Sequence, residues 1–489
     1  MTSAFLGLDV GTTGIKALAA DEFGRIVFSA ERPLSLSTPR PAWAEQNPQD
    51  WWDGVQALLK DVPAELKIER LGLSGQMHTL VPLDAGGAVV RPAILWCDQR
   101  TAAECVQAQQ AVGGEARMVE LTGNPVYPGF TLPKILWLRN HEPESFKRLK
   151  TALIAKDYVA YQLTGEMGSE PSDASGSSMF DVAAGRWSRP VLEALDLDPA
   201  LLPPLTPSSA ARGRLKSSLA QSLRWDRVEV AAGAADNAAS ALGLGVAEPG
   251  DCVVSIGTSG TVLAVTSARV PDGSGRLHFF RHALPESWYL MGVMLSAASC
   301  LDWIKKLIAP DLAWERLEAE AAQAPMGADG LSWLPYLQGE RTPHRDPHAR
   351  GVLFGLSSGV GRGAIFRAVM EGVTCGLRDS FELLEALTPI DRVLVVGGGA
   401  RSRLWRRLLA AHLKRPVTAP AVDQGGAYGA AMLAALGAGV DLKTVRSWAT
   451  RAETVEPEAK EFDRCDAVHE QHRALYQALK GRFEAAARI

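Results

Sequence analysis

The stretch FLGLDVGTTGIKALAAD, residues 5–21, decides the fold, because it reads as two apolar strands joined by an abrupt turn. The turn, Gly11-Thr12-Thr13-Gly14, combines two hydroxyls with two glycines and follows Asp9 closely. Glycine permits the positive φ values of a tight turn and the close approach of an anion. The pattern therefore predicts a β-hairpin whose backbone N–H groups and hydroxyls converge on one point.

A second copy of this pattern lies about half the chain further on. CVVSIGTSGTVLAVTS, residues 252–267, again reads as strand, Gly-Thr-Ser-Gly and strand. It follows GVAEPGD, a stretch with proline and glycine that suits a domain boundary. We predict two related halves, residues 1–245 and 246–445, and a C-terminal helical tail, residues 446–489.

Strand-like runs alternate with helical patterns along the whole chain, which favours an α/β protein with mixed sheets covered by helices. NPQDWWDGVQALLKDV, residues 47–62, predicts one such helix. Asn47 can cap it, and Pro48 suits its first turn.

Composition limits the classes of function. Of the 489 residues, 47% are apolar and 22% are charged, as in ordinary soluble proteins. A net charge of −4 without blocks of like charge gives no reason to expect nucleic acid or a membrane as a partner. The N-terminus shows no secretory signal pattern. Six scattered cysteines without a Cys-x-x-Cys pair predict reduced thiols and a cytoplasmic protein.

The two Gly-Thr turns, one from each half, could hold a polyphosphate from both sides. Asp9 has no acidic counterpart, because Ser255 stands at the equivalent position of the second copy. A single carboxylate near phosphate oxygens suits Mg²⁺. The alternative is two ordinary β-turns with a surface aspartate, but the matched pair makes us favour phosphate binding.

A third glycine-rich turn lies in RVLVVGGGARSRLWRRLLAAHL, residues 392–413. It resembles a nucleotide-binding turn, in which glycines admit the ligand and a helix N-terminus attracts phosphate. It lacks the spacings of a dinucleotide site and of a Walker-type site. A device for packing a helix on a strand is the alternative interpretation.

Asp236 is the candidate catalytic base. In VEVAAGAADNAASALGLG, residues 228–245, it stands among alanines and glycines, where a carboxylate is costly without partners or solvent. At a strand end facing a cleft it could take a proton from a substrate hydroxyl. The alternative is an N-cap for the next helix, and both roles can hold together.

Three further stretches supply polar or aromatic residues. Gln76, Met77 and His78 follow a predicted strand in LGLSGQMHTLVPLD, and Trp96 lies in AILWCDQR. An indole face suits the C–H surface of a sugar. For the polar, turn-rich loop LPYLQGERTPHRDPHARG, residues 334–351, we predict an interdomain role.

These motifs occur in an order that resembles the FGGY carbohydrate kinases. The resemblance rests on LDVGTTGIKA, WAEQNPQDWW, GQMH, RPAILWCDQR, DNAASALGLG, SIGTSG, HALPESWYLMGVMLSAASCLDW, LPYLQGERTPH and VVGGGARSRLW, and it covers nearly the whole chain. Within that family the chain looks most similar to the members that act on D-xylulose.

The resemblance implies two ribonuclease H-like domains of the actin-like ATPase type, with mixed sheets flanked by helices and a catalytic cleft between them. It implies transfer of the γ-phosphoryl group of ATP to the 5-hydroxyl of a ketose, D-xylulose, with Mg²⁺, and it allows a homodimer. Asp236 would be the base, Asp9 would serve the metal, and Met77 and His78 would contact the sugar. We add Gln76, Trp96 and Asn237 to the sugar site. The nucleotide site would comprise Thr12, Thr13, Lys16, Gly257, Thr258, Gly398 and Gly399.

Two rival functions stay open at this level. One is a kinase of the same fold that acts on ribulose, gluconate or glycerol. The other is an actin-like ATPase that uses nucleotide to switch partner binding and needs no sugar.

Overall fold

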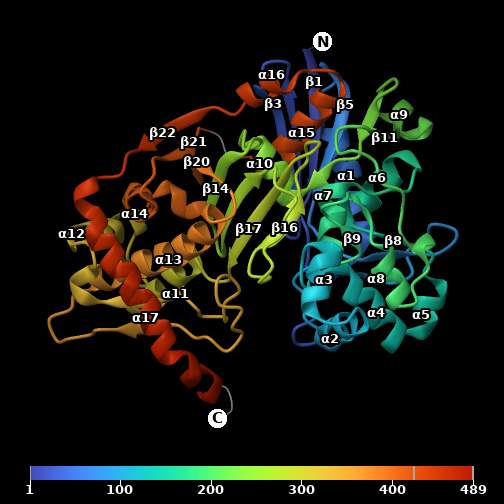
Figure 1. Ribbon diagram of the computed structural model, residues 1–489. Coiled ribbons are helices and arrows are strands. Elements are labelled where there is room, and N and C mark those ends of the chain that lie inside the picture. The colour runs from blue at the N-terminus through green and yellow to red at the C-terminus, as the bar shows by residue number, and fades with distance from the viewer. Residues whose placement is uncertain (1, 422–423, 487–489) are drawn as a thin grey trace.

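The computed structural model describes residues 2–421 and 424–486, which form two α/β halves side by side (Figure 1). Each half is built on a seven-stranded sheet that mixes parallel and antiparallel strands. The first sheet contains β1 (Thr2–Val10), β2 (Gly14–Asp21), β3 (Ile26–Pro33), β5 (Leu66–Gly75), β11 (Ala211–Arg214), β12 (Glu229–Ala231) and β13 (Ala234–Ala235). The second contains β14 (Gly250–Ile256), β15 (Gly260–Thr266), β16 (His278–Arg281), β17 (Trp288–Met294), β20 (Ile390–Val396), β21 (Val417–Pro420) and β22 (Arg451–Val455).

The two sheets share the arrangement that the repeated turn predicted. β1 pairs antiparallel with β2 and parallel with β5, while β14 pairs antiparallel with β15 and parallel with β20. Asp9 lies opposite Lys16 in the first hairpin, and Ser255 lies opposite Thr261 in the second. The predicted pair of hairpins and the mixed sheets are therefore confirmed.

Each sheet is covered on its outer face by helices of its own half. α1 (Pro48–Asp61) and α6 (Ala155–Thr164) pack on the first sheet, with Trp51 and Tyr158 in the shared core. α11 (Ala298–Ile308), α12 (Trp314–Gln323), α13 (Arg362–Glu385) and α14 (Arg403–Leu413) pack in the second half. The predicted start of α1 is confirmed, because the Asn47 side chain accepts a hydrogen bond from the N–H of Gln49 and Pro48 is the first helical residue.

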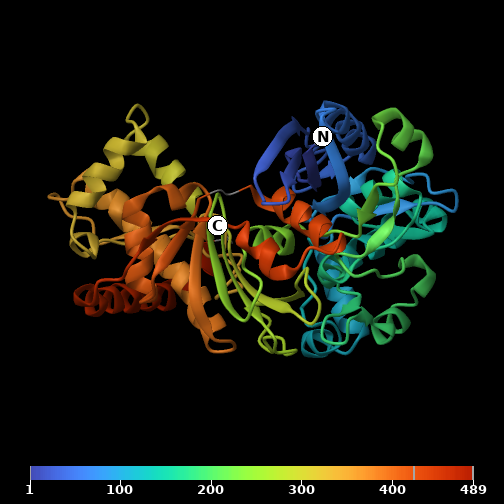
Figure 2. The same ribbon diagram turned by 90° about the horizontal axis from the view of Figure 1, so that it is seen from above.

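Two helices lie between the sheets. α10 (Asp236–Gly243) and α15 (Gly425–Gly437) form one core with residues of both halves, and Figure 2 shows α15 near the centre of the molecule. The sequence placed residues 425–437 in the second half, yet α15 packs directly on β1 and β5 of the first. Small residues make this possible: a Cβ on Gly7 would lie 1.9 Å from the Ala427 carbonyl oxygen, and one on Gly72 would lie 1.9 Å from that of Ala430.

We expect Gly429→Ala to lower the free energy of unfolding by about 1–3 kcal/mol, the usual cost of overpacking a core. A Cβ at this position would lie 1.7 Å from the Ala239 carbonyl oxygen of α10, so the two helices would have to move apart. Urea unfolding measures the change. The control is Gly481→Ala in α17 (Phe462–Ala486), where a Cβ has open space and alanine should instead stabilise by up to about 1 kcal/mol. Equal stability of both variants would contradict this packing.

The segment that the sequence described as a helical tail, residues 446–489, is not helical throughout. β22 forms an antiparallel edge strand on β21 before α17 begins. The side chains of β22 alternate in exposure, which is the pattern of a strand at a sheet edge. α17 then lies along the second half and packs on α13, α14 and β18 (Ser332–Leu334) (Figure 1).

Hydrogen bonds and an ion pair join the two halves. Arg345, in the loop 334–351, donates two hydrogen bonds of 2.8 and 2.7 Å to the carboxylate of Glu115. The Asn124 side chain donates to the Phe279 carbonyl and accepts from the Phe279 N–H, at 2.8 and 2.9 Å. The interdomain role predicted for this loop is thus confirmed. Within residues 2–421 and 424–486, none of the helices combines the length and apolar character needed to cross a bilayer.

Candidate active site

A cavity of about 230 Å³ lies between the two halves and brings together five of the predicted residues. It is smaller than the pockets that hold drug-sized ligands, so it suits a small polar molecule. The predicted residues are Met77, His78, Trp96, Asp236 and Asn237, all from the first half. The second half contributes Ser259, Thr261, His278, Phe280, Met291, Val293 and Arg341.

Asp236 is brought to the cavity by β13, which pairs with the end of β5, and it is the first residue of α10. Its Oδ1 accepts hydrogen bonds from the backbone N–H and the side-chain amide of Asn237, at 2.7 and 3.1 Å. Asp236 therefore lies both at the start of a helix and on the wall of the cavity. Burial, and then the charge of Asp9, raise the pKa of Asp236 to about 7. A carboxylate that titrates near neutral pH is suited to general base chemistry.

His78 occupies a turn that follows β5, with a positive φ of 67°. Its Nδ1 lies 2.7 Å from the Gly176 carbonyl oxygen. Because a carbonyl can only accept, Nδ1 holds the hydrogen and Nε2 is left as an acceptor. Burial lowers the pKa of His78 well below its usual value, so the ring is neutral. Lys134 fixes the turn by donating to the carbonyl oxygens of His78 and Gly129, at 2.8 and 2.6 Å.

Gln76 does not line this cavity, although the sequence assigned it to the sugar. Only 1% of Gln76 is exposed, and its Nε2 donates to the Gln46 side chain and the Gly11 carbonyl, at 3.2 and 3.3 Å. Its Oε1 accepts from the Thr79 hydroxyl at 3.0 Å. Gln76 thus lies under the first Gly-Thr turn and supports it, while the next two residues turn toward the cavity.

The first turn is linked to the cavity through Trp96. The indole N–H of Trp96 donates to the Thr12 hydroxyl at 2.9 Å, and 41% of Trp96 is exposed. Since its N–H is occupied, Trp96 offers the cavity its ring. Thr13 is exposed, and the Lys16 ammonium donates to the side chain of Gln424.

Asp9 lies near the end of β1, beside Ser74 of the neighbouring strand. Among residues 2–421 and 424–486 no hydrogen-bond partner is found for its buried Oδ1. Burial raises the pKa of Asp9, opposed by the Ser74 hydroxyl and the charge of Lys16. A buried carboxylate oxygen that lacks a partner among the described residues fits a hydrated Mg²⁺ ion.

The second and third turns adjoin each other. The carbonyls of Gly257 and Thr258 accept the N–H groups of Ala298 and Ala297 at the start of α11, at 2.8 and 2.9 Å. A Cβ on Gly399 would lie 2.4 Å from Cγ2 of Ile256, so this glycine serves packing on β14. Gly398 is exposed, and a Cβ there would meet nothing within 4 Å.

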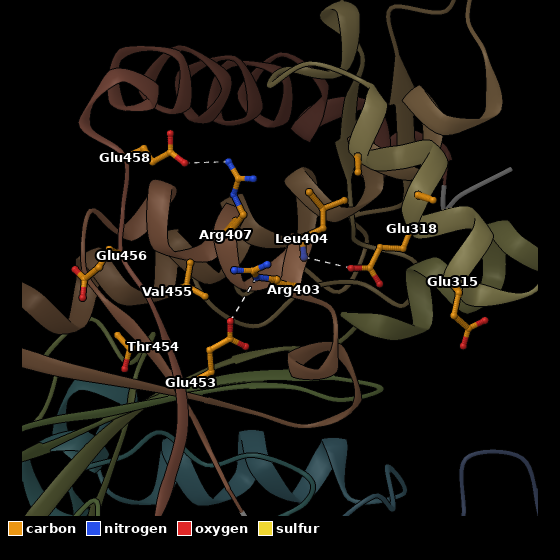
Figure 3. A pocket seen from close by; sticks show the side chains of 12 residues that line it. Glu315, Glu318, Arg403, Leu404, Arg407, Glu453, Thr454, Val455, Glu456 and Glu458 are labelled. Atoms are coloured by element: carbon orange, nitrogen blue, oxygen red, sulfur yellow. Dashed lines mark hydrogen bonds and ion pairs between the residues drawn. The ribbon is translucent and has the colours of Figure 1, made fainter.

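The N-terminus of α14, which the sequence pattern suggested would attract phosphate, is occupied by the protein itself. Glu318 accepts a hydrogen bond from the Ser402 hydroxyl at 2.7 Å. It also accepts one from the Leu404 N–H at 3.2 Å (Figure 3). This contact borders a surface groove of about 610 Å³ between α12, α14 and β22, which none of the predicted site residues lines. A phosphate at the third turn would therefore have to use the backbone of Gly398 and its neighbours.

The sequence predicted none of the residues in the second-half wall of the cavity, and neither Tyr127 nor Phe130 of the first half. It also missed Lys134, which holds the turn at His78. His278 and Arg341 are the polar members of that wall with ionisable side chains. A histidine in the apolar run LHFF was a usable signal for His278. Arg341 lies in the loop 334–351, whose interdomain role was predicted without any residue being assigned to the ligand.

Comparisons with known proteins agree with this geometry. Residues 4–243 match the N-terminal domain of the FGGY family of carbohydrate kinases, and residues 252–438 match its C-terminal domain. The xylulose kinase of Escherichia coli (strain K12) is 39% identical over 483 residues, 97% of this chain and 99% of that protein. The xylulose kinase of Klebsiella pneumoniae is 40% identical over 410 residues, 83% of this chain and 84% of that protein.

Solved structures show the same similarity. A crystal structure described as a xyloylose kinase from Brucella ovis superposes with a TM-score of 0.92 at 40% identity, covering 98% of this chain and 99% of that one. The xylulose kinase from Rhodospirillum rubrum superposes with a TM-score of 0.93 at 32% identity, covering 98% of this chain and 100% of that one.

Proposed function

Because this chain belongs to the FGGY family of carbohydrate kinases, we propose that it transfers the γ-phosphoryl group of ATP to the 5-hydroxyl of D-xylulose. The product is D-xylulose 5-phosphate. The chain is a phosphotransferase with ATP and a sugar as substrates, and the names of its relatives support a ketose.

One observation supports the chemistry above all others: Asp236 faces the cavity between the halves with a pKa raised to about 7 by burial and by Asp9. The free carboxylate oxygen of Asp236 takes the proton from the 5-hydroxyl of the sugar. The oxygen of this hydroxyl attacks the γ-phosphorus in line. Phosphoryl transfer asks the protein mainly for alignment and charge neutralisation, so no phosphoenzyme is needed. The rest of the sugar is bound by Met77, Asn237, Nε2 of His78 and the ring of Trp96.

ATP is bound at three turns. These turns supply Thr12, Thr13 and Lys16 from the first, Gly257 and Thr258 from the second, and Gly398 and Gly399 from the third. Asp9, whose buried Oδ1 has no partner among the described residues, would hold Mg²⁺. When bound, the ion neutralises charge on the phosphate oxygens. Asp9 and Lys16 face each other across the first hairpin and so place one negative and one positive group beside the nucleotide.

The pH dependence of kcat/KM for the sugar tests the base. Asp236 must be deprotonated to act, so kcat/KM should rise with pH through an apparent pKa near 7 and level off above it. The negative charge of Asp9 favours the protonated form of Asp236. Asp9→Asn should therefore shift this limb to lower pH, measured relative to the variant's own plateau. A limb that does not move would show that the two carboxylates do not interact.

Release of ADP with ATP–Mg²⁺ across D-xylulose, D-ribulose, L-ribulose, gluconate and glycerol tests the substrate. We expect D-xylulose to give the highest kcat/KM. A higher value with another compound would assign the chain to a different kinase of this fold. ATP turnover that no sugar stimulates would favour an actin-like ATPase.

Two further properties stay proposals. All six cysteines are free and five of them are buried, which suits a reducing compartment, and we place the protein in the cytoplasm. A homodimer is our expectation for the oligomeric state, and light scattering after gel filtration measures it.

A further inference from the structure

The second-half wall of the cavity contains a cation whose side chain is not paired with an acid. Arg341 lies in the loop between β18 and β19 (Val352–Phe354), and its guanidinium lines the cavity. Across residues 2–421 and 424–486 its side chain makes no hydrogen bond or ion pair; its one recorded contact is with the Tyr127 ring, at 5.8 Å from the ring centroid. Arg341 thus brings five N–H donors to the cavity, and no side chain or carbonyl of the described residues accepts from them.

The acidic residue next to Arg341 is hydrogen-bonded to the backbone and forms no ion pair with the Arg341 side chain among the described residues. Glu340 accepts hydrogen bonds from the N–H groups of Leu295 and Arg341, at 2.9 and 2.8 Å, and is buried. Burial raises the pKa of Glu340 to about 8, so this group is mostly protonated at neutral pH. Arg345, four residues further on, is paired with Glu115. Arg350, the third arginine of the loop, donates to the carbonyls of Pro347 and Ala349. The loop therefore uses Arg345 to join the halves and leaves the Arg341 side chain for a ligand.

The two halves contribute chemically different groups to the cavity. Asp236 and Asn237 come from the first half. Arg341 comes from the second half; burial lowers the pKa values of His78 and His278, and the charge of Arg341 adds to this effect. These rings stay neutral, so Arg341 is the one charged donor among the described residues that line the cavity.

The proposed reaction dictates which form of the sugar must occupy this space. Ring closure of a 2-pentulose to a furanose joins C2 to the oxygen on C5, which is the oxygen that is phosphorylated. The reacting sugar is therefore acyclic and has a free C2 carbonyl. When C5 of the sugar lies at Asp236, the C2 carbonyl lies toward the other end of the sugar's carbon chain.

We propose that Arg341 is a specificity-determining residue that donates hydrogen bonds to the C2 carbonyl oxygen of acyclic D-xylulose, an inference that rests on the proposed function. A carbonyl oxygen has two in-plane lone pairs and no hydrogen, which matches the planar fork of a guanidinium. The neutral Nε2 of His78 accepts from a neighbouring hydroxyl. Together they recognise a ketone flanked by hydroxyls and favour the open-chain form.

The test is Arg341→Met with Arg341→Lys as the conservative variant and Arg345→Met as the matched control from the same loop. Loss of a charged hydrogen bond should weaken calorimetric D-xylulose binding and raise KM by roughly 10- to 100-fold, with a smaller change in kcat. Lysine should restore part of the affinity. Xylitol, in which C2 bears a hydroxyl, should lose less affinity in Arg341→Met than D-xylulose does.

The results distinguish a failure of the role proposed for Arg341 from a failure of the proposed function. D-xylulose affinity and KM in Arg341→Met within twofold of wild type would overturn the role of Arg341, and so would an equal loss for xylitol and D-xylulose. Arg345→Met should keep the wild-type ratio of the two affinities. If the wild type itself does not phosphorylate D-xylulose, the proposed function fails instead.

Discussion

Asp236→Asn is expected to lower kcat by about 10²–10⁴-fold while D-xylulose still binds, the usual range for loss of a general base. Asparagine keeps the shape of the side chain and can still accept the hydrogen bond from the Asn237 N–H. It cannot take the proton of the 5-hydroxyl. The loss should therefore fall on turnover and leave the first turn of α10 in place.

Calorimetry with D-xylulose measures sugar binding, and steady-state ADP release measures turnover. Asp226→Asn is the control, because that carboxylate belongs to the same half and its side chain is 93% exposed. It should keep wild-type turnover. Near-normal turnover in Asp236→Asn together with normal sugar binding would leave Asp236 as a helix-terminal residue only.

Asp9→Asn is expected to lower the maximal rate and to raise the Mg²⁺ concentration at half-maximal rate by roughly 10- to 100-fold, the scale seen when groups around a metal are altered. Asp9 has a buried carboxylate oxygen with no protein partner among the described residues, and its equivalent in the second hairpin is Ser255. Of the two equivalent hairpin positions, Asp9 and Ser255, only Asp9 can therefore offer a carboxylate to the ion. D-xylulose affinity should change little.

Rates measured over a Mg²⁺ titration check this, with Ser255→Ala as the variant at the matching position of the second hairpin. Ser255→Ala should keep the wild-type Mg²⁺ dependence. If Asp9→Asn matches the wild type in both Mg²⁺ dependence and maximal rate, Asp9 is an ordinary turn residue and the metal must be held elsewhere.

The sequence by itself determined the features that depend on neighbours in the chain. The two hairpins follow from apolar runs around glycine-containing turns, and the start of α1 follows from Asn47 and Pro48. Asp236 could be predicted as the catalytic base because a carboxylate among alanines and glycines is energetically costly unless it has partners, solvent or a function. Such features are set by backbone preferences and hydrogen bonds over a few residues.

The tertiary structure alone decided how distant segments meet. Residues 425–437 pack on the first sheet because Gly7 and Gly72 let α15 approach the strands closely. Gln76 supports the first turn, Glu318 occupies the N-terminus of α14, and Arg341 reaches the cavity from a loop more than 100 residues beyond Asp236. The raised pKa of Asp236 likewise depends on burial between two halves and on Asp9. Packing and long-range electrostatics between residues far apart in the chain leave no local pattern, so these contacts could not be predicted from residue order.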